Sequence, residues 1–172
     1  LPANQRAVLI LREVLGFSAR ETAASLETSV ASVNSALQRA RKTVDDKLPE
    51  QSQQATLRAL GDDGVRAVVE GYMDAMGRGD VERMVELLAA DAAWSMPPLP
   101  AWFTGTEALR GFMSNGPLSG DWRWRHRATR ANGQAAVGSY AWYAPDGAYR
   151  PFALDVMTLD GRRIAAVTSF IN

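Results

Sequence analysis

The chain has 172 residues with 19 basic and 19 acidic side chains, so its overall charge indicates neither a nucleic-acid partner nor a membrane surface. Cysteine is absent, which excludes disulfides and thiolate metal sites and fits a reducing compartment such as the cytoplasm. No apolar run approaches the roughly 18–20 residues that span a bilayer. We expect no metal and no cofactor. Because the first residue is not methionine, we expect a fragment that lacks an upstream part.

Residues 1–48 have the pattern of an all-α domain, because no stretch within them alternates like a strand. Proline suits a first helical turn and glycine suits a helix end. The first helix is therefore predicted from about Pro2 to Leu15, before Gly16. Ser18 followed by Glu21 three residues later forms a capping box, which predicts a short second helix from Ser18 to about residue 26.

A third helix is predicted after a turn at Glu27 and Thr28, with Ser29 as its N-cap. Glu27 stands where the turn between two such helices often holds glycine, so we expect a strained or slightly wider turn. On a helical wheel the apolar side chains form one narrow stripe: Val30, Val33, Leu37, Ala40 and Val44. The opposite face carries small polar side chains first and cations last, with no acid between Glu27 and Asp45.

The polar face of this third helix has two interpretations. The first is an ordinary solvated face of a helical bundle, on which Arg41 would pair with Asp45 four residues later. The second is a face that lies against DNA. Small side chains permit close approach, Asn and Gln can pair with adenine, and cations neutralise phosphates. Residues 1–44 carry six cations against three acids, a small excess that fits either interpretation.

This segment resembles region 4 of sigma-70-type RNA polymerase sigma factors of the extracytoplasmic-function group. The resemblance rests on LPxxQRAVLxLRxVxGFS, on ETA in the second helix and on SVASVNSALxRAR. It implies a helix-turn-helix of the winged-helix-like DNA-binding class that rests on the flap of the polymerase β subunit and places its third helix in the major groove of the −35 promoter element. By position, the candidates for base contact are Ser32, Asn34, Ser35 and Gln38, and those for phosphate contact are Arg39, Arg41 and Lys42. Three phosphate contacts give a modest salt dependence, so this domain alone should bind DNA weakly.

Residues 49–64 are polar and rich in glutamine, and we interpret them as a linker that is partly helical around Ala55–Leu60. They separate a first domain at 1–48 from a second at 65–172. The second domain begins with helices and continues as strands between Asn-Gly, Pro-Asp-Gly and Asp-Gly turns.

Helices followed by an antiparallel meander predict a curved sheet wrapped on helices, an α+β cone. The helices are predicted at Val65–Met76, after an Asp80 cap, and at Glu107–Asn115. The strands are predicted at Ala92–Met96, Trp122–Thr129, Gln134–Tyr143, Tyr149–Leu159 and Arg163–Ile171.

The second domain resembles the SnoaL-like polyketide-cyclase family of the nuclear-transport-factor-2-like superfamily. The resemblance rests on YMDAMGRGDVERMVELLAADAAWSMPP, on WFTGTEAL and on LDGRRIAAVTSFIN. It implies a pocket, in which enzymes of this fold use an aspartate, histidine or tyrosine on an acidic C–H or an epoxide. Sigma factors with a fused SnoaL-like domain form a set to which the whole chain is similar. In that set the appended domain is thought to regulate the sigma factor.

The side chains that we expect to line this pocket are Tyr72, Trp94, Met96, Trp102, Trp124, His126 and Tyr140, each with ordinary core packing as its alternative. His126, the single histidine, alternates onto the face of Trp124, where it is either a general base or a core histidine bonded to a carbonyl. We expect Asp155 to face solvent and find no convincing acid/base pair, so we do not expect an enzyme. A small apolar ligand remains a candidate partner.

The other face of the strand at Trp122–Thr129 carries Arg123, Arg125 and Arg127. This arginine stripe is either a solvated sheet face or a surface for a partner.

Three functions remain open from the sequence: a transcription-initiation factor with a regulatory cone, a small-molecule isomerase, cyclase or hydrolase, and a ligand-sensing transcription regulator. A buried carboxylate within hydrogen-bonding reach of a tyrosine or histidine in the pocket would favour the enzyme. A dry aromatic pocket without such a pair would favour the sensor.

Overall fold

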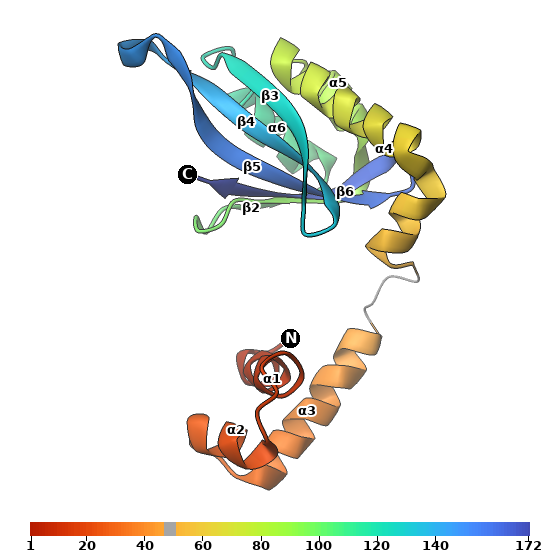
Figure 1. The fold of residues 1–172 in the computed structure, drawn as a ribbon, viewed down its shortest axis with the longest axis vertical. Coiled ribbons are helices and arrows are strands. Elements are labelled where there is room, and N and C mark those ends of the chain that lie inside the picture. Colours follow the sequence, from red (N-terminus) through yellow and green to blue (C-terminus); the bar gives the residue numbers. More distant parts are fainter. Residues whose placement is uncertain (47–50) are drawn as a thin grey trace. The chain divides into compact units, whose positions relative to one another are not determined.

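The structure is a computed structural model that describes residues 1–46 and 51–172. It divides into two compact units, Leu1–Glu50 and Gln51–Asn172, each with its own hydrophobic core (Figure 1). The predicted domain boundary at residues 48 and 49 lies outside the described residues.

Residues 1–46 form four helical segments: α1 (Ala3–Leu9), the π-helix η1 (Ile10–Val14), α2 (Ala19–Ser25) and α3 (Val30–Asp45). The core of this N-terminal unit is formed by Val8, Ala23, Val33, Ala36 and Leu37. The predicted apolar stripe of α3 is therefore correct at its centre. It is wrong at its start, because Val30 is 42% exposed and Ala36 packs inward instead.

Local capping defines the ends of these helices as the sequence predicts. Ser18 and Glu21 form both hydrogen bonds of the capping box, and the Ser29 hydroxyl accepts from the Ser32 N–H at 3.1 Å. Gly16 ends the first helical stretch with a φ of 72°. Glu27 adopts a φ of 49°, so the turn between α2 and α3 holds a non-glycine residue in the left-handed region, as the strained-turn prediction requires.

The segment that we interpreted as a linker is largely helical in the structure. Helix α4 runs from Gln53 to Arg78, with a kink at Gly61, where φ is 67° and ψ is 170°. The Gln53 side chain donates to the Leu159 carbonyl at 2.9 Å and accepts from the Leu159 N–H at 2.6 Å. These two bonds attach the start of α4 to a strand of the C-terminal unit, so residues 53–64 belong to the cone and do not form a free connection.

The C-terminal unit adds α5 (Val81–Leu87), α6 (Thr106–Asn115) and the short 3₁₀ segment η2 (Ala144–Asp146). The strands are β1 (Leu88–Ser95), β2 (Trp102–Thr104), β3 (Trp124–Ala131), β4 (Gln134–Tyr143), β5 (Ala148–Asp160) and β6 (Arg163–Ile171). Strands β4 and β6 have the predicted bounds. Strand β1 begins four residues earlier than predicted, and β2 was not predicted because three residues give too short a pattern.

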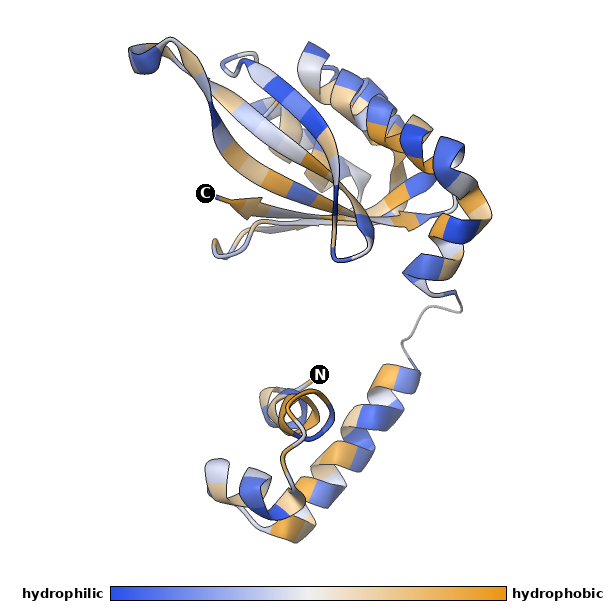
Figure 2. Cartoon of the chain, in the orientation of Figure 1, coloured by the Kyte–Doolittle hydropathy of each residue, from blue (hydrophilic) through white to orange (hydrophobic). Residues whose placement is uncertain are grey.

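The six strands form one curved sheet in the order β2-β1-β6-β5-β4-β3, antiparallel except for the β1–β6 pair. Helices α4, α5 and α6 lie against one side of this sheet, so that the two layers enclose the core (Figure 1). The hydropathy colouring shows the alternation of hydrophobic and polar residues along the strands and around the helices (Figure 2). We call the helix-covered side the inner face and the opposite side the outer face.

Candidate functional site

The exposed face of α3 carries most of the side chains that the sequence assigns to DNA. Asn34, Ser35, Gln38, Arg39 and Lys42 are exposed. Ser32 is half-buried, because it lies in the first turn beside the Ser29 cap. The structure thus brings together small polar side chains at the start of α3 and cations toward its end, on a face that the core does not use.

Arg41 has a partner that the sequence did not indicate. Its guanidinium donates to the Glu13 carboxylate of η1 at 2.6 Å, so it does not form the alternative i,i+4 pair with Asp45. Both side chains remain about half exposed, so water screens the pair and it contributes little to stability. The contact connects α3 to η1 and directs the Arg41 guanidinium toward Glu13.

A second surface of the N-terminal unit is apolar. Two residues of η1, Ile10 and Val14, are exposed, and so is Leu15, which caps the end of η1. Val14 is 73% exposed. Phe17, just beyond Gly16, is also exposed. Adjacent exposed apolar side chains of this kind are common where a protein contacts a partner.

The C-terminal unit contains a partly open cavity of about 180 Å³ between the helices and the inner face of the sheet. Its lining residues are mostly aromatic or aliphatic: Met76, Trp94, Met96, Phe112, Pro117, Trp122, Trp124, Phe152, Ala153 and Ile171, with Gly116. Three polar side chains also reach it, namely Ser139, Asp155 and Ser169. Small-molecule sites typically combine such an apolar lining with a few placed polar groups.

Asp155 is the centre of the polar part of this cavity. Its side chain is only 3% exposed, which overturns the prediction that it faces solvent. Oδ2 accepts from the Ser139 hydroxyl at 2.7 Å and from the Tyr72 hydroxyl at 3.2 Å, and Oδ1 accepts from the Ser169 hydroxyl at 2.5 Å. A carboxylate offers about four acceptor positions, so roughly one remains for a donor in the cavity.

Two further groups extend this network. The Trp94 indole N–H donates to the Ser169 hydroxyl at 2.9 Å, which directs the serine proton toward Asp155. Tyr72 is fully buried, and burial together with the negative charge of Asp155 raises its pKa well above the ordinary value. Tyr72 therefore remains a protonated donor at neutral pH.

The structure places the seven predicted pocket residues in different environments. Trp94, Met96 and Trp124 line the cavity, and Tyr72 contacts it through Asp155. Trp102 does not line it: its side chain is 70% exposed, because its register partner Ser95 points to the outer face.

Tyr140 also lies outside the cavity. It follows Ser139 on β4 and so points to the outer face, where its ring lies 3.5 Å from the position of a Cβ built on Gly138. Ser139 and Ser169 are the cavity residues that sequence reasoning missed. The pattern that could have identified them is a small polar residue at an inward position on each of two predicted strands.

His126 occupies a half-buried position beside the Trp124 ring, with the ring centroids 6.1 Å apart. It is the register partner of Ser139, so it shares the inner face, but it is not among the residues that line the cavity. Burial lowers the pKa of His126, and the charge of Asp155 partly opposes this shift. Its Nε2 is buried with no hydrogen-bond partner among the residues that the structure describes, so this nitrogen does not form the carbonyl bond of the core-histidine alternative.

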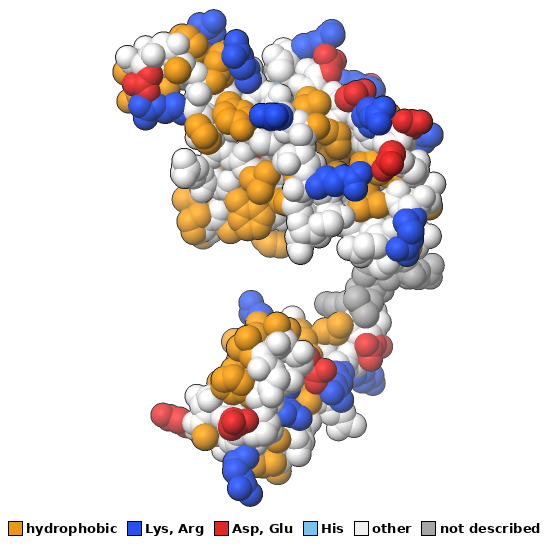
Figure 3. Space-filling view, viewed as in Figure 1, with side chains coloured by type: hydrophobic (Ala, Val, Ile, Leu, Met, Phe, Trp, Pro, Cys, Tyr) orange, Lys and Arg blue, Asp and Glu red, His pale blue; other side chains and the backbone are white. Residues whose placement is uncertain are grey.

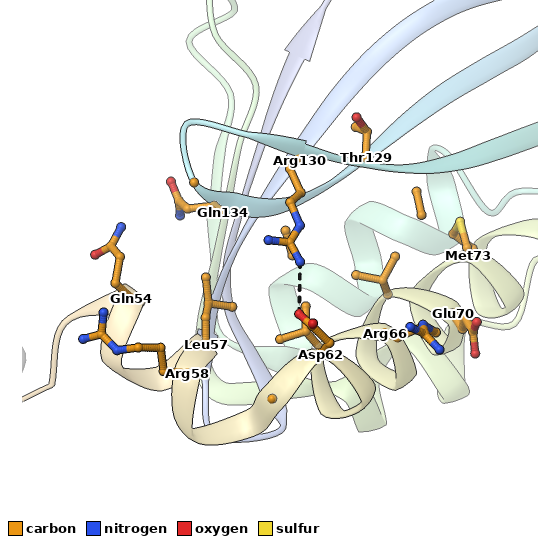
Figure 4. Close-up of a pocket in the computed structure, with 16 residues that line it drawn as sticks. Gln54, Leu57, Arg58, Asp62, Arg66, Glu70, Met73, Thr129, Arg130 and Gln134 are labelled. Atoms are coloured by element: carbon orange, nitrogen blue, oxygen red, sulfur yellow. Dashed lines mark hydrogen bonds and ion pairs between the residues drawn. The ribbon is translucent and has the colours of Figure 1, made fainter.

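A larger groove of about 930 Å³ lies between α4 and the β3–β4 hairpin (Figure 4). Leu57 lies at its base, and an ion pair between Arg130 and Asp62 crosses it at 3.2 Å. Both partners of this pair are largely exposed, so water screens them. We place the candidate site in the smaller cavity, because there a buried carboxylate meets an apolar lining.

The geometry defines two classes of module: a compact helix-turn-helix with an exposed polar α3, and an α+β cone that contains an apolar cavity with one buried carboxylate. The comparisons with known proteins agree with both. Residues 1–44 match the family model of sigma-70, region 4, and residues 69–167 match that of the SnoaL-like domain. The chain belongs to the SnoaL-like family, whose model covers more than half of it, and the residues before this domain are similar to sigma-70, region 4.

The whole chain is 32% identical to the ECF RNA polymerase sigma factor SigG of Mycobacterium tuberculosis, and it spans 46% of the length of that protein. Among solved structures, it is similar to an NTF-2 like protein of unknown function from Burkholderia xenovorans, at 16% identity with a TM-score of 0.54. That match covers 66% of this chain and 86% of the other.

The chain is also similar to the epoxide hydrolase/cyclase-like enzyme SalBIII, at 19% identity with a TM-score of 0.50. That match covers 64% of this chain and 92% of the enzyme. At such identities the two structures show the fold of the C-terminal unit alone. In residues 1–46 and 51–172, no helix is both long and apolar enough to cross a membrane.

Proposed function

We propose that this chain acts in transcription initiation as part of a sigma factor. Residues 1–48 recognise the −35 promoter element and bind core RNA polymerase, and the cone that follows regulates them. The observation that carries this proposal is the exposed polar face of α3 on a unit whose sequence matches sigma-70, region 4. The similarity to SigG over the whole chain supports it.

Promoter recognition is assigned to side chains that α3 leaves in solvent. Asn34 and Gln38, one helical turn apart, can each donate to and accept from an adenine edge. Ser32 and Ser35 are short enough for the backbone to approach the groove closely. Arg39 and Lys42 then meet phosphates beyond the bases, and Arg41 reaches one only if it leaves Glu13.

Polymerase binding is assigned to the exposed apolar side chains Ile10, Val14 and Leu15. These residues do not belong to the face of α3 that we assign to DNA. The flap of the polymerase β subunit is the partner that we propose for them. A double substitution, Val14→Ser with Leu15→Ser, should weaken binding of the labelled chain to core polymerase and leave DNA binding unchanged.

The test of promoter recognition is selection of duplexes from a random pool by this chain with core polymerase present. The chain should enrich one motif. Asn34→Ala should relax it at one position, with a loss of about 1–3 kcal/mol of discrimination. The double variant Arg39→Gln with Lys42→Gln should bind all duplexes more weakly by the same factor. It should also reduce the salt slope of log affinity by about 1.8. Arg6→Gln on α1 is the control, and enrichment of no motif by the unsubstituted chain would contradict the proposal.

A second function for the cone is favoured by one observation, the buried Asp155 at the side of an apolar cavity. We propose that the cavity binds a small, mainly apolar molecule that carries one hydrogen-bond donor. The carboxylate within reach of Tyr72 meets the condition set above for an enzyme. However, Tyr72 is fully buried and already donates its hydrogen bond to Asp155. This geometry therefore favours binding of a ligand in the cavity over proton transfer by Tyr72.

The test compares the binding of 2-naphthol with that of naphthalene, two molecules that differ by one hydrogen-bond donor. Both are about the size of the cavity, and only the naphthol can donate to Asp155. Thermal unfolding should shift upward with 2-naphthol more than with naphthalene, and Asp155→Asn should reduce the difference. Equal shifts for the two compounds, or none, would argue against a site centred on Asp155.

A further inference from the structure

The outer face of β3 carries three arginines that the cavity and the core do not use. Arg123, just before β3, and Arg125 and Arg127 within it alternate with the inward Trp124 and His126, and all three are exposed. We call these three side chains the arginine ladder. In the space-filling view, separate cationic side chains lie over the β3–β4 part of the C-terminal unit, with hydrophobic side chains between them (Figure 3).

Aromatic rings of the neighbouring strands hold two members of this ladder. The Arg123 guanidinium carbon lies 5.0 Å from the centroid of the Trp142 ring, and that of Arg125 lies 4.3 Å from the centroid of Tyr149. A guanidinium over an aromatic face is attracted by the ring and loses part of its torsional freedom. Its planar fork of N–H donors therefore stays available to a partner at a smaller entropic cost.

The charge of the ladder is not neutralised within the protein. The sequence from 122 to 145 contains four arginines and no acidic residue, although the whole chain has a net charge of zero. Three exposed arginines of the helices in this unit, Arg78, Arg83 and Arg110, each form an ion pair. None of the ladder arginines does so among the residues that the structure describes. A solvated face with this local excess favours an anionic partner.

We propose that the arginine ladder binds the phosphate backbone of duplex DNA, next to the promoter element that α3 reads. This inference rests on the proposed function, because α3 would bring the cone to DNA. Alternate residues of a strand are separated by about 6.6–6.8 Å, two rises of 3.3–3.4 Å. Neighbouring phosphates of one DNA strand rise by about 3.4 Å along the duplex axis and also turn around it, so their separation through space is roughly twice that rise. Successive arginines of the ladder can therefore meet neighbouring phosphates of one DNA strand.

DNA fits this surface better than an acidic protein does. The rings of Trp142 and Tyr149 already lie under guanidinium groups, so they offer no open apolar anchor of the kind that protein interfaces use. Three phosphate contacts would give a weak, salt-sensitive interaction. It gains strength only because the helix-turn-helix belongs to the same chain and raises the effective concentration of DNA.

The test compares two triple variants of the complete chain that lose the same charge. In the ladder variant, Arg123, Arg125 and Arg127 become Gln. In the matched control, Arg78→Gln, Arg83→Gln and Arg110→Gln remove three arginines of the helices. Fluorescence anisotropy measures the affinity for a random-sequence duplex of about 30 base pairs between 50 and 200 mM salt.

The ladder variant should reduce the salt slope of log affinity by about 2.7, from three contacts of about 0.9 each. Across this fourfold salt range, three such contacts account for about a 40-fold change in affinity. The control should change the slope by less than one. A third variant that replaces the ladder with Lys should retain most of the slope, because lysine keeps the charge, and it reports on folding defects in the Gln variant.

Equal slopes for the ladder variant and the control would overturn the inference, since charge alone would then explain the effect. An unchanged DNA slope with weaker binding to core polymerase would assign the ladder to an acidic protein surface instead. The random-sequence duplex separates this test from that of promoter recognition. Suppose that the unsubstituted chain selects no motif but the ladder variant still lowers the salt slope of log affinity. This result would support the DNA contact of the ladder and contradict only the proposed function.

Discussion

At the scale of single residues, Asp155 determines the chemistry of the cone. Its charge is buried with three hydroxyl donors, and a buried carboxylate is tolerated only when it is hydrogen-bonded in this way. Each donor comes from a different element, Tyr72 from α4, Ser139 from β4 and Ser169 from β6. The carboxylate therefore connects the helix layer to the sheet at the position where the cavity opens.

The raised pKa of Tyr72 predicts a loss of stability in alkali. The unfolded chain loses this phenol proton near pH 10, whereas the folded chain retains it to a higher pH. The stabilisation is complete below pH 10. Above it the unfolded state binds fewer protons, so the free energy of unfolding falls by up to about 1.4 kcal/mol per pH unit. Urea unfolding between pH 7 and 11 should show this fall.

Tyr72→Phe isolates the contribution of this group. It should lower stability at pH 7 by about 1.5–3 kcal/mol, because a hydrogen bond to a charged group is lost. Above pH 10 the free energy of unfolding of this variant should also fall less steeply with pH than that of the unsubstituted chain. Tyr143→Phe, on an exposed tyrosine, is the control and should keep the original slope. Identical alkaline slopes for all three proteins would contradict the assignment.

At the scale of elements, the two units are built by different means. Local capping defines α2 and α3, through the Ser18–Glu21 box and the Ser29 hydroxyl. The cone depends on pairing between distant strands and on one irregularity in β5. Ser139 pairs with Ala153 and Tyr140 with Pro151, so Phe152 is the extra residue of a bulge.

The turn at Glu27 connects α2 to α3 at an energetic cost. A non-glycine residue in the left-handed region costs about 1–2 kcal/mol, and glycine avoids most of this cost but loses more chain entropy on folding. Glu27→Gly should therefore be more stable than Glu27→Ala by about 0.5–1 kcal/mol.

Urea unfolding followed by the circular dichroism of the helices measures this difference. Tryptophan fluorescence serves as the internal control, because all five tryptophans lie between residues 94 and 142 and report on the cone alone. A fluorescence transition that moves with Glu27→Gly, or an alanine variant as stable as the glycine variant, would contradict the strained-turn explanation.

At the scale of the whole molecule, the chain joins a helix-turn-helix unit to a cone that contains an apolar cavity. The cavity and the arginine ladder lie on opposite faces of the same strand, because Trp124 points inward and Arg123, Arg125 and Arg127 point outward. An occupant that moved β3 would also move the ladder. The proposed regulation by the cone and the proposed DNA contact therefore share one structural element.

The sequence by itself determined the features that depend on neighbours along the chain. The helix caps, the left-handed glycine at Gly16 and the strained turn at Glu27 were predictable because short-range geometry fixes them. The separation of arginines from aromatic residues on β3 was predictable for the same reason, since alternation along a strand is local. The family resemblance added the fold of both units.

The tertiary structure alone decided which face of each strand is covered and to which unit residues 53–64 belong. Alternation divides β5 into two sets of residues but does not say which set the helices cover. The bulge at Phe152 then places this apolar ring on the cavity side together with Asp155, although simple alternation separates the two. Likewise, the helix predicted around Ala55–Leu60 joins the cone because Gln53 pairs with Leu159, a residue 106 positions away.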